Sequence, residues 1–251
     1  MYRCGKTHGM SSVTLKRHRR PYRWLLQLAP PHAWTTARYE LAMTWLRLTR
    51  PRVDRRFVGA SGLLVNIGCG RNGKAGWVNV DSIAAPGVTC VYDCRKHLPL
   101  ATGSAKAVFT EHLLEHLEYE DEVPAFLAEC HRILEPGGVL RIVVPDGSKY
   151  LAAYCANDWD ALRSVSPLVT DRDQTVVTMM EIVNEHFRQA GQHRFSYDYE
   201  TLERLLGKMG FEAVAQSRFG ESRLPGLAID SSTRETESLY VEACAARTPP
   251  P

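Results

Sequence analysis

Short apolar segments alternate with longer polar and amphipathic ones through the middle of the chain. Five apolar runs stop at a glycine or a carboxylate, as buried strands of a parallel sheet do. They are Leu63–Gly68, Trp77–Asp81, Val88–Asp93, Lys106–Glu111 and Val139–Asp146. This alternation predicts an α/β fold with a mainly parallel sheet.

Helices are predicted where apolar residues recur every three or four positions. The clearest are Glu122–Leu134 and Tyr199–Met209, the second of which ends before Gly210. Thr36–Leu48 places Leu41, Trp45 and Leu48 on one face. Shorter or less regular helices are expected at Tyr22–Leu28 and within Lys149–Gln192.

The last two apolar runs, Phe211–Phe219 and Glu237–Ala245, are predicted to be strands that pair in antiparallel fashion. The chain then divides into three parts. Residues 1–60 form a basic arm with helical pieces, residues 61–245 form the main domain with a helical insertion at about 149–192, and residues 246–251 ("ARTPPP") form a disordered tail.

Composition is that of an ordinary globular protein, with 44% apolar and 24% charged residues among 251. The charge is lopsided. Up to Ala60 there are 13 Lys and Arg against 2 acidic residues, whereas the remainder has 18 against 26. The basic arm could be a flap over an active site, a surface for anionic lipid in peripheral membrane contact, or a nucleic-acid contact, which is the less expected partner.

Seven cysteines, an odd number without a C-x-x-C pair, argue against a disulfide framework and favour the cytoplasm. No apolar run approaches the ~20 residues of a membrane span. No signal peptide is expected, because the apolar piece after the N-terminal arginines is short and is broken by Pro30 and Pro31.

Candidate chemistry gathers at the predicted strand ends. "NIGCG" (Asn66–Gly70) gives a glycine turn directly after the first strand, and glycines there let a backbone approach a ligand closely. Asp81 and Asp93 end the next two strands, where carboxylates can accept hydrogen bonds from a ribose diol and an adenine amine. Neither G-x-G-x-x-G nor G-K-[ST] is present, which argues against a dinucleotide or a nucleoside triphosphate. The pattern favours another nucleoside-bearing ligand.

Four segments carry a family resemblance: "LLVNIGCGRNGKAGWVNVD", "VYDCRKHLPL", "TEHLLEHLEY" and "FLAECHRILEPGGVLRIVVPD". In order and spacing they resemble the class I S-adenosylmethionine-dependent methyltransferases, in particular the bacterial small-molecule type known as methyltransferase 11. The resemblance covers about Leu63 to Asp146 and continues weakly beyond. It implies a Rossmann-like sheet of seven strands, mainly parallel with an antiparallel last strand, helices on both faces, and S-adenosyl-L-methionine as cofactor.

The resemblance also assigns cofactor contacts. The turn residues Asn66, Gly68, Cys69 and Gly70 would line the amino-acid part of the cofactor. Asp81 would hold the ribose and Asp93 the adenine edge, while Glu111 and His112 would lie beside the cofactor. Only ten residues separate Gly70 from Asp81, so a short turn must replace the usual first helix.

The implied reaction is methyl transfer to a hydroxyl of a small molecule or glycan, by in-line displacement in a dry pocket. A hydroxyl acceptor calls for a base, and the candidates are His112, Asp146 and His193. Two alternatives stay open: an inactive subunit that only binds cofactor, and an RNA-directed methyltransferase that uses the basic arm. Oligomeric state is not encoded in any visible pattern.

His112, Glu115 and His116 spell H-x-x-E-H, which can mark a zinc peptidase. That interpretation needs a third ligand, and Glu181 or Glu185 is a poorly supported choice. We expect Glu115 and His116 to enter a helix after the fourth strand, with a structural role or a place beside the cofactor. No metal site is predicted.

Overall fold

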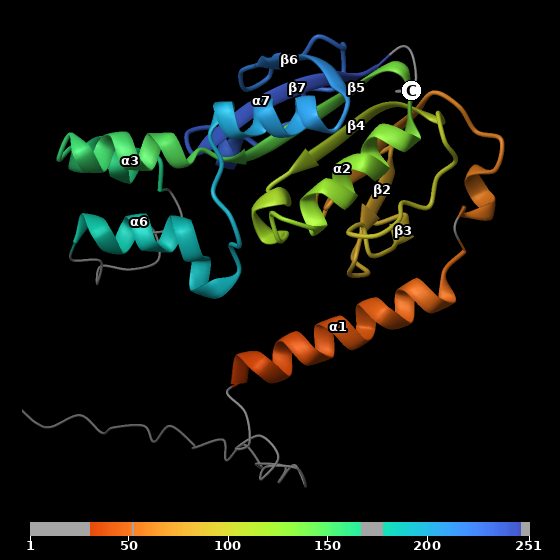
Figure 1. Cartoon of the computed structure of the whole chain (residues 1–251), viewed down its shortest axis with the longest axis horizontal. Coiled ribbons are helices and arrows are strands. Elements are labelled where there is room, and N and C mark those ends of the chain that lie inside the picture. Colours follow the sequence, from red (N-terminus) through yellow and green to blue (C-terminus); the bar gives the residue numbers. More distant parts are fainter. Residues whose placement is uncertain (1–30, 52, 167–177, 247–251) are drawn as a thin grey trace, which may run out of the picture. The chain divides into compact units, whose positions relative to one another are not determined.

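The computed structural model describes residues 31–51, 53–166 and 178–246 (Figure 1). The chain divides into two compact units, Met1–Ala42 and Met43–Pro251. The predicted helix at Tyr22–Leu28 and nearly all of the predicted tail lie outside the described residues. Within the described part, no helix is long and apolar enough to cross a membrane.

A seven-stranded sheet forms the centre of the second unit, in the order β3-β2-β1-β4-β5-β7-β6 (Figure 1). The strands are β1 Leu63–Ile67, β2 Val78–Asp81, β3 Cys90–Val91, β4 Ala105–Glu111, β5 Leu134–Pro145, β6 Phe211–Gln216 and β7 Ser238–Ala245. Strands β1 to β5 pair in parallel, and β7 runs antiparallel to both β5 and β6. The prediction of a mainly parallel sheet with an antiparallel last strand is confirmed.

Two strands differ in extent from their predictions. β3 is only two residues long. β5 begins at Leu134, five residues before the predicted Val139, because the "EPGG" segment continues as an irregular part of the strand. A Cβ at Gly138 would lie 3.1 Å from the carbonyl oxygen of Lys106, so the chain passes too close to β4 there for a side chain. The sequence signal for a turn therefore marks a bulge.

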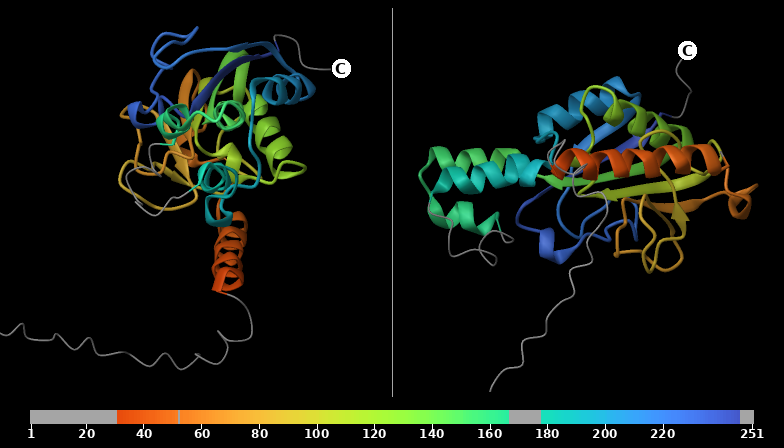
Figure 2. Two further views of the ribbon diagram at one scale, coloured as in Figure 1. Left: turned by 90° about the vertical axis from the view of Figure 1, so that its left-hand side faces the viewer. Right: turned by 90° about the horizontal axis from the view of Figure 1, so that it is seen from below.

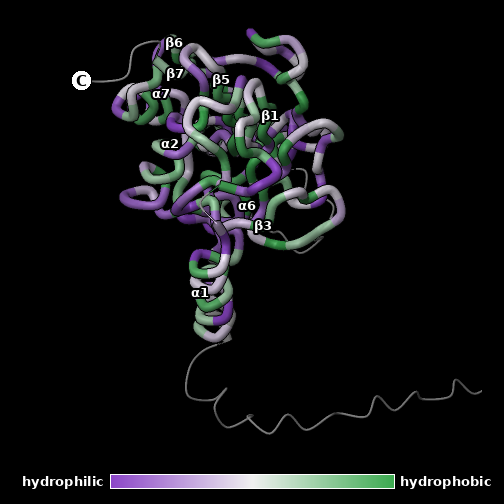
Figure 3. The backbone as a smooth tube through the Cα atoms, turned by 90° about the vertical axis from the view of Figure 1, so that its right-hand side faces the viewer, coloured by the Kyte–Doolittle hydropathy of each residue, from purple (hydrophilic) through white to green (hydrophobic). Residues whose placement is uncertain are grey.

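The hydrophobic core lies on both faces of the sheet, where the strands carry most of the apolar sequence (Figure 3). Helices α2 (Glu122–Ile133) and α7 (Tyr199–Lys208) cover one face. The loop of residues 217–237 covers the other with Leu224, Leu227 and Ile229 (Figure 2). In this unit the links from β1 to β2 and from β2 to β3 carry no helix, because they are too short to hold one.

The predicted helical insertion contains α3 (Gly147–Cys155), α4 (Trp159–Ser164) and α6 (Met179–Arg188). These helices bury a small core of their own, which includes Tyr150, Leu162 and Ile182, and α3 lies beside α6 (Figure 2). The predicted helix at Thr36–Leu48 lies within α1 (Pro31–Thr49). Of its C-terminal residues, Met43 and Leu46 are buried, whereas Trp45 and Leu48 of the predicted apolar face are exposed.

Arg141 on β5 is fully buried and joins the loop of residues 217–237 to the sheet. Its guanidinium donates to Asp230 at 2.6 and 2.8 Å and to Glu242 on β7 at 3.0 Å. It also donates to the carbonyl oxygen of Arg218 at 2.9 Å. Arg141 therefore pairs with two buried carboxylates and fixes the loop, and Glu242 also accepts from Arg223 at 3.3 Å.

We predict that Arg141→Met lowers the free energy of unfolding by about 3–5 kcal/mol, because it leaves buried charges without a partner. Urea denaturation measures the change. Arg194→Met is the matched control, because Arg194 pairs with the exposed Glu118, and it should cost no more than about 1 kcal/mol. Equal effects of the two variants would contradict a structural role for the buried pair.

Candidate cofactor site

Strand order reverses between β1 and β4, because β1 leads to β2 on one side and pairs with β4 on the other. In an open α/β sheet this switch point opens a crevice beyond the carboxyl ends of the strands. The glycine turn follows β1 there, and Asp81 ends β2. The predicted residues therefore lie at the edge where such folds bind ligands.

The glycine turn needs glycine at two positions. Gly68 has a φ of 72° and Gly70 a φ of 52°, in the left-handed region that side chains disfavour. A Cβ at Gly68 would also lie 3.0 Å from Leu113, which follows β4, whereas one at Gly70 would face open space. Gly68 donates its backbone N–H to the carbonyl oxygen of Val80 at 2.9 Å, which ties the turn to β2. The backbone at Gly70 is therefore open to a ligand.

Among the described residues, only backbone amides donate hydrogen bonds to Asp81. Its Oδ2 accepts from the N–H of Gly70 at 2.8 Å and its Oδ1 from the N–H of Ile83 at 2.9 Å. The side chain is partly exposed. Each carboxylate oxygen has a second lone pair, so Asp81 can still accept from a pair of hydroxyls.

Asp93 is 5% exposed, and arginines bind both of its oxygens. Arg95 donates to Oδ1 at 2.9 Å and to Oδ2 at 3.1 Å, and Arg47 donates to Oδ2 at 2.7 Å. Burial alone would raise the pKa of Asp93, but the two guanidiniums outweigh it and hold the pKa below its ordinary value. An adenine amine at Asp93 would have to share this carboxylate with both arginines, neither of which the sequence analysis identified.

Two buried cysteine thiols lie close enough to Asp81 or Asp93 for these carboxylates to affect their pKa values. Burial, reinforced by Asp93 and Asp81, raises the pKa of Cys94 to about 12. Burial and Asp81 raise the pKa of Cys69 to about 11. Asp81 therefore lies close to the thiol of Cys69 in the glycine turn. Asp81 and Asp93 both lie close to the thiol of Cys94, which follows β3.

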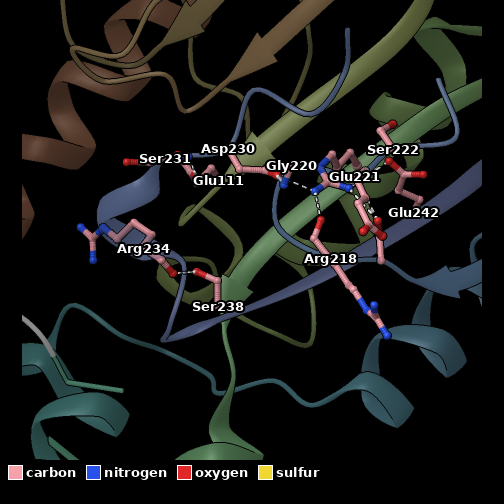
Figure 4. Close-up of polar contacts among 12 residues, drawn as sticks. Glu111, Arg218, Gly220, Glu221, Ser222, Asp230, Ser231, Arg234, Ser238 and Glu242 are labelled. Atoms are coloured by element: carbon pink, nitrogen blue, oxygen red, sulfur yellow. Dashed lines mark hydrogen bonds and ion pairs between the residues drawn. The ribbon is translucent and has the colours of Figure 1, made fainter. Parts of the chain in front are cut away.

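Asn66 and Glu111 are held by protein contacts. Asn66 is buried and donates to the side-chain oxygen of Asn79 at 3.3 Å, which braces the short link between β1 and β2. Glu111 accepts from the N–H of Ser231 at 2.8 Å (Figure 4), and burial raises the pKa of its carboxyl group. Their contacts with a cofactor stay predictions.

His112 directly follows β4 and has a φ of 51°, which is uncommon for a residue other than glycine. Its Nδ1 lies 3.3 Å from a carboxylate oxygen of Glu115, and its Nε2 lies 2.9 Å from the hydroxyl of Ser238. That hydroxyl donates its only proton to the carbonyl oxygen of Arg234, at 2.6 Å. Nε2 of His112 must therefore donate, which leaves Nδ1 facing Glu115.

The H-x-x-E-H segment does not enter a helix as expected. Leu114–His116 is a single 3₁₀ turn, and α2 begins only at Glu122, so the two histidines do not lie one helical turn apart. Neither suggested third ligand joins them: Glu181 caps α6 together with Thr178, and Glu185 is exposed. The geometry on which the zinc-peptidase interpretation depended is absent from this segment.

The other two candidate bases have different surroundings. Asp146 caps α3 by accepting from the N–H and the hydroxyl of Ser148, at 3.1 and 2.6 Å. Nδ1 of His193 lies 2.5 Å from the carbonyl oxygen of His186, and its ring lies 5.0 Å from that of His116. Burial lowers the pKa of His193 and lowers that of His186 to about 4, which favours neutral rings. The structure thus brings His193 to the H-x-x-E-H segment and uses Asp146 as a cap.

The family model described as a methyltransferase domain matches residues 82–142, from the end of β2 into β5. Over this segment the chain is similar to S-adenosylmethionine-dependent methyltransferases, and S-adenosylmethionine is the cofactor that the match indicates. The matched segment contains Asp93, Glu111 and His112, whereas the glycine turn and Asp81 precede it.

Several solved structures of methyltransferases are similar to this chain at low sequence identity. Phosphoethanolamine N-methyltransferase 2 of Haemonchus contortus is 13% identical with a TM-score of 0.43; the match covers 75% of this chain but only 50% of the nematode enzyme. A methyltransferase from Archaeoglobus fulgidus is 17% identical, with coverage of 82% and 94% and a TM-score of 0.45. A Burkholderia thailandensis 1,6-didemethyltoxoflavin-N1-methyltransferase is 14% identical, with coverage of 85% and 81% and a TM-score of 0.45. No curated protein matches the sequence.

The methyltransferase site fits the cofactor at the glycine turn and at Asp81. Gly70 leaves space beside its backbone, and Asp81 keeps acceptor capacity for a ribose diol. The carboxylates also suit a ligand with a positively charged sulfonium. At Asp93 the fit depends on sharing the carboxylate with Arg47 and Arg95.

We predict that S-adenosylhomocysteine at a hundred times its dissociation constant stabilises the protein by about 2.7 kcal/mol. Asp81→Ala should abolish this gain, because the ribose loses its acceptor, while the ligand-free variant still unfolds cooperatively. Thermal denaturation with and without the ligand measures both. Asp160→Ala, at a fully exposed carboxylate of α4, should keep the gain. A full gain in the Asp81 variant would place the ribose elsewhere.

Proposed function

We propose that this methyltransferase transfers the methyl group to a hydroxyl of a small molecule or glycan. The proposal is supported by one observation: histidines and a buried carboxylate gather just after β4, next to the glycine turn. Leu113, which touches the turn, lies between His112 and the 3₁₀ turn that carries Glu115 and His116. A sulfonium methyl is already activated, so the acceptor side determines which protein groups the reaction needs.

A hydroxyl must lose a proton as it is methylated, whereas a neutral amine already offers its lone pair. Proton-accepting side chains beside the cofactor site therefore favour an alcohol acceptor. Of the three predicted bases, His193 fits best. A carbonyl oxygen can only accept, so Nδ1 of His193 carries the proton and Nε2 carries a lone pair. His112 donates through Nε2, and Asp146 is engaged as a helix cap.

The two alternative functions remain predictions. An inactive, cofactor-binding subunit would share the glycine turn and Asp81 with an active enzyme. A role of the basic arm in RNA or lipid binding falls mainly on residues 1–30, which lie outside the described part of the chain. No described contact favours either function over methylation of a small-molecule or glycan hydroxyl.

We predict that His193→Gln lowers turnover of a hydroxyl acceptor by about 10²- to 10⁴-fold, the usual contribution of a positioned base. Labelled S-adenosylmethionine and a panel of glycan and small-molecule acceptors first identify the acceptor. The variant should retain full stabilisation by S-adenosylhomocysteine, which separates loss of chemistry from loss of cofactor binding.

His131→Gln is the matched control for this substitution. His131 also bonds a backbone carbonyl oxygen, that of Gly210, but lies on α2 away from the H-x-x-E-H segment. Its turnover should stay near that of the unmodified protein. If amines alone are methylated, or if the two variants behave alike, the hydroxyl proposal is wrong.

A further inference from the structure

Glu115 is 1% exposed, yet within the described part of the chain neither of its carboxylate oxygens accepts a hydrogen bond of standard geometry. Three imidazoles surround it. Nδ1 of His112 lies at 3.3 Å and Nε2 of His116 at 3.8 Å from the same oxygen, and His193 brings a ligand atom within 4.8 Å of those of Glu115 and His116. A buried carboxylate without a donor costs free energy that native structures seldom leave uncompensated.

The hydrogen bonds on the far side of each ring show which nitrogens hold protons. His116 and His193 present Nδ1 to the carbonyl oxygens of Gln192 and His186, at 3.2 and 2.5 Å. Carbonyl oxygens only accept, so both rings hold a proton on Nδ1, and in the neutral ring Nε2 is free to bind a cation. Nε2 of His112 donates to Ser238, and its Nδ1 faces Glu115 at 3.3 Å.

The side chains of His116 and His193 thus lie beside one buried carboxylate that accepts no hydrogen bond of standard geometry from the described residues. A cation at this position would balance the charge of the carboxylate. Histidines that ligate a metal typically donate their other N–H to a backbone carbonyl oxygen, as His116 and His193 do here.

We propose that Glu115, His116 and His193 bind a divalent transition-metal cation of the Zn²⁺ or Co²⁺ class. Two imidazoles and one carboxylate form a ligand set that Zn²⁺ accepts, with at least one position left for water or another oxygen. Atoms bound to one such cation at about 2.1 Å lie within roughly 4.2 Å of each other, so a small rotation of an imidazole completes the set.

This site differs from the zinc-peptidase interpretation, because His112 is not a ligand and the third ligand, His193, comes from the segment after α6. The proposal goes beyond the proposed function and does not depend on it. A cation bound to His193 would occupy the lone pair that could otherwise take up a proton, so the two uses of this residue exclude each other at any one time.

Cobalt(II) is the probe, because its visible absorption reports coordination by nitrogen and oxygen without any assay of activity. The full chain carries Cys4→Ser and Cys155→Ser in every sample, so that these two thiols cannot bind metal. We expect one Co²⁺ per chain by equilibrium dialysis, with a visible band that Zn²⁺ removes. Glu115→Gln and His193→Gln should each weaken Co²⁺ binding by at least about tenfold.

His97→Gln is the matched control, because His97 also faces a glutamate, Glu129 at 3.1 Å, but in a different part of the sheet edge. It should bind Co²⁺ as the parent does. Melting curves without metal show that each variant is folded. The proposal is overturned if the parent binds no stoichiometric Co²⁺, or if binding survives unchanged in both cluster variants. Stabilisation by S-adenosylhomocysteine, measured in the same samples, tests the cofactor site separately.

Discussion

Parallel pairing on both sides of β1 is the constraint on which the rest of the structure depends. Because β1 is bonded in parallel to β2 and to β4, the chain leaves all three strands at the same edge of the sheet. The glycine turn, Asp81 and His112 are therefore neighbours in space although they are far apart in sequence. The link between β1 and β2 is too short for a helix, so none separates the turn from Asp81, and the bond between Asn66 and Asn79 braces this link.

Three carboxylates near that edge are stabilised in three different ways, and this difference assigns their uses. Asp93 is neutralised by two arginines, so its charge is already satisfied by the protein. Asp81 accepts only from uncharged backbone amides and keeps capacity for a ligand. Glu115 faces imidazoles, whose charge depends on a proton or a metal. Asp81 and Glu115 therefore keep the capacity to interact with a ligand or cation that binds beside them.

Sequence patterns predicted the parts of the structure that depend on local order. Strand ends at glycines and carboxylates, and the helical spacing in Glu122–Leu134, follow from residues that are close in the chain. The contact of Arg47 with Asp93 spans 46 positions, and His193 reaches Glu115 only because the chain returns after α6. The "EPGG" signal was misleading because glycine serves a bulge as well as a turn. Residues that are close in the chain reveal neither these distant contacts nor whether a glycine serves a bulge or a turn.

The charge of the Glu115 cluster bears on the kind of acceptor that could lie beside it. If Glu115 pairs with one protonated imidazole, the pair has no net charge. If Glu115 binds a divalent cation instead, the cluster has a net charge of about +1. A sulfonium is itself positive, and like charges in a water-poor crevice repel strongly. A protonated amine would then be disfavoured next to both. An oxygen acceptor, neutral or negative, would be favoured beside such a cation, but only the metal-free cluster leaves His193 free to act as the base.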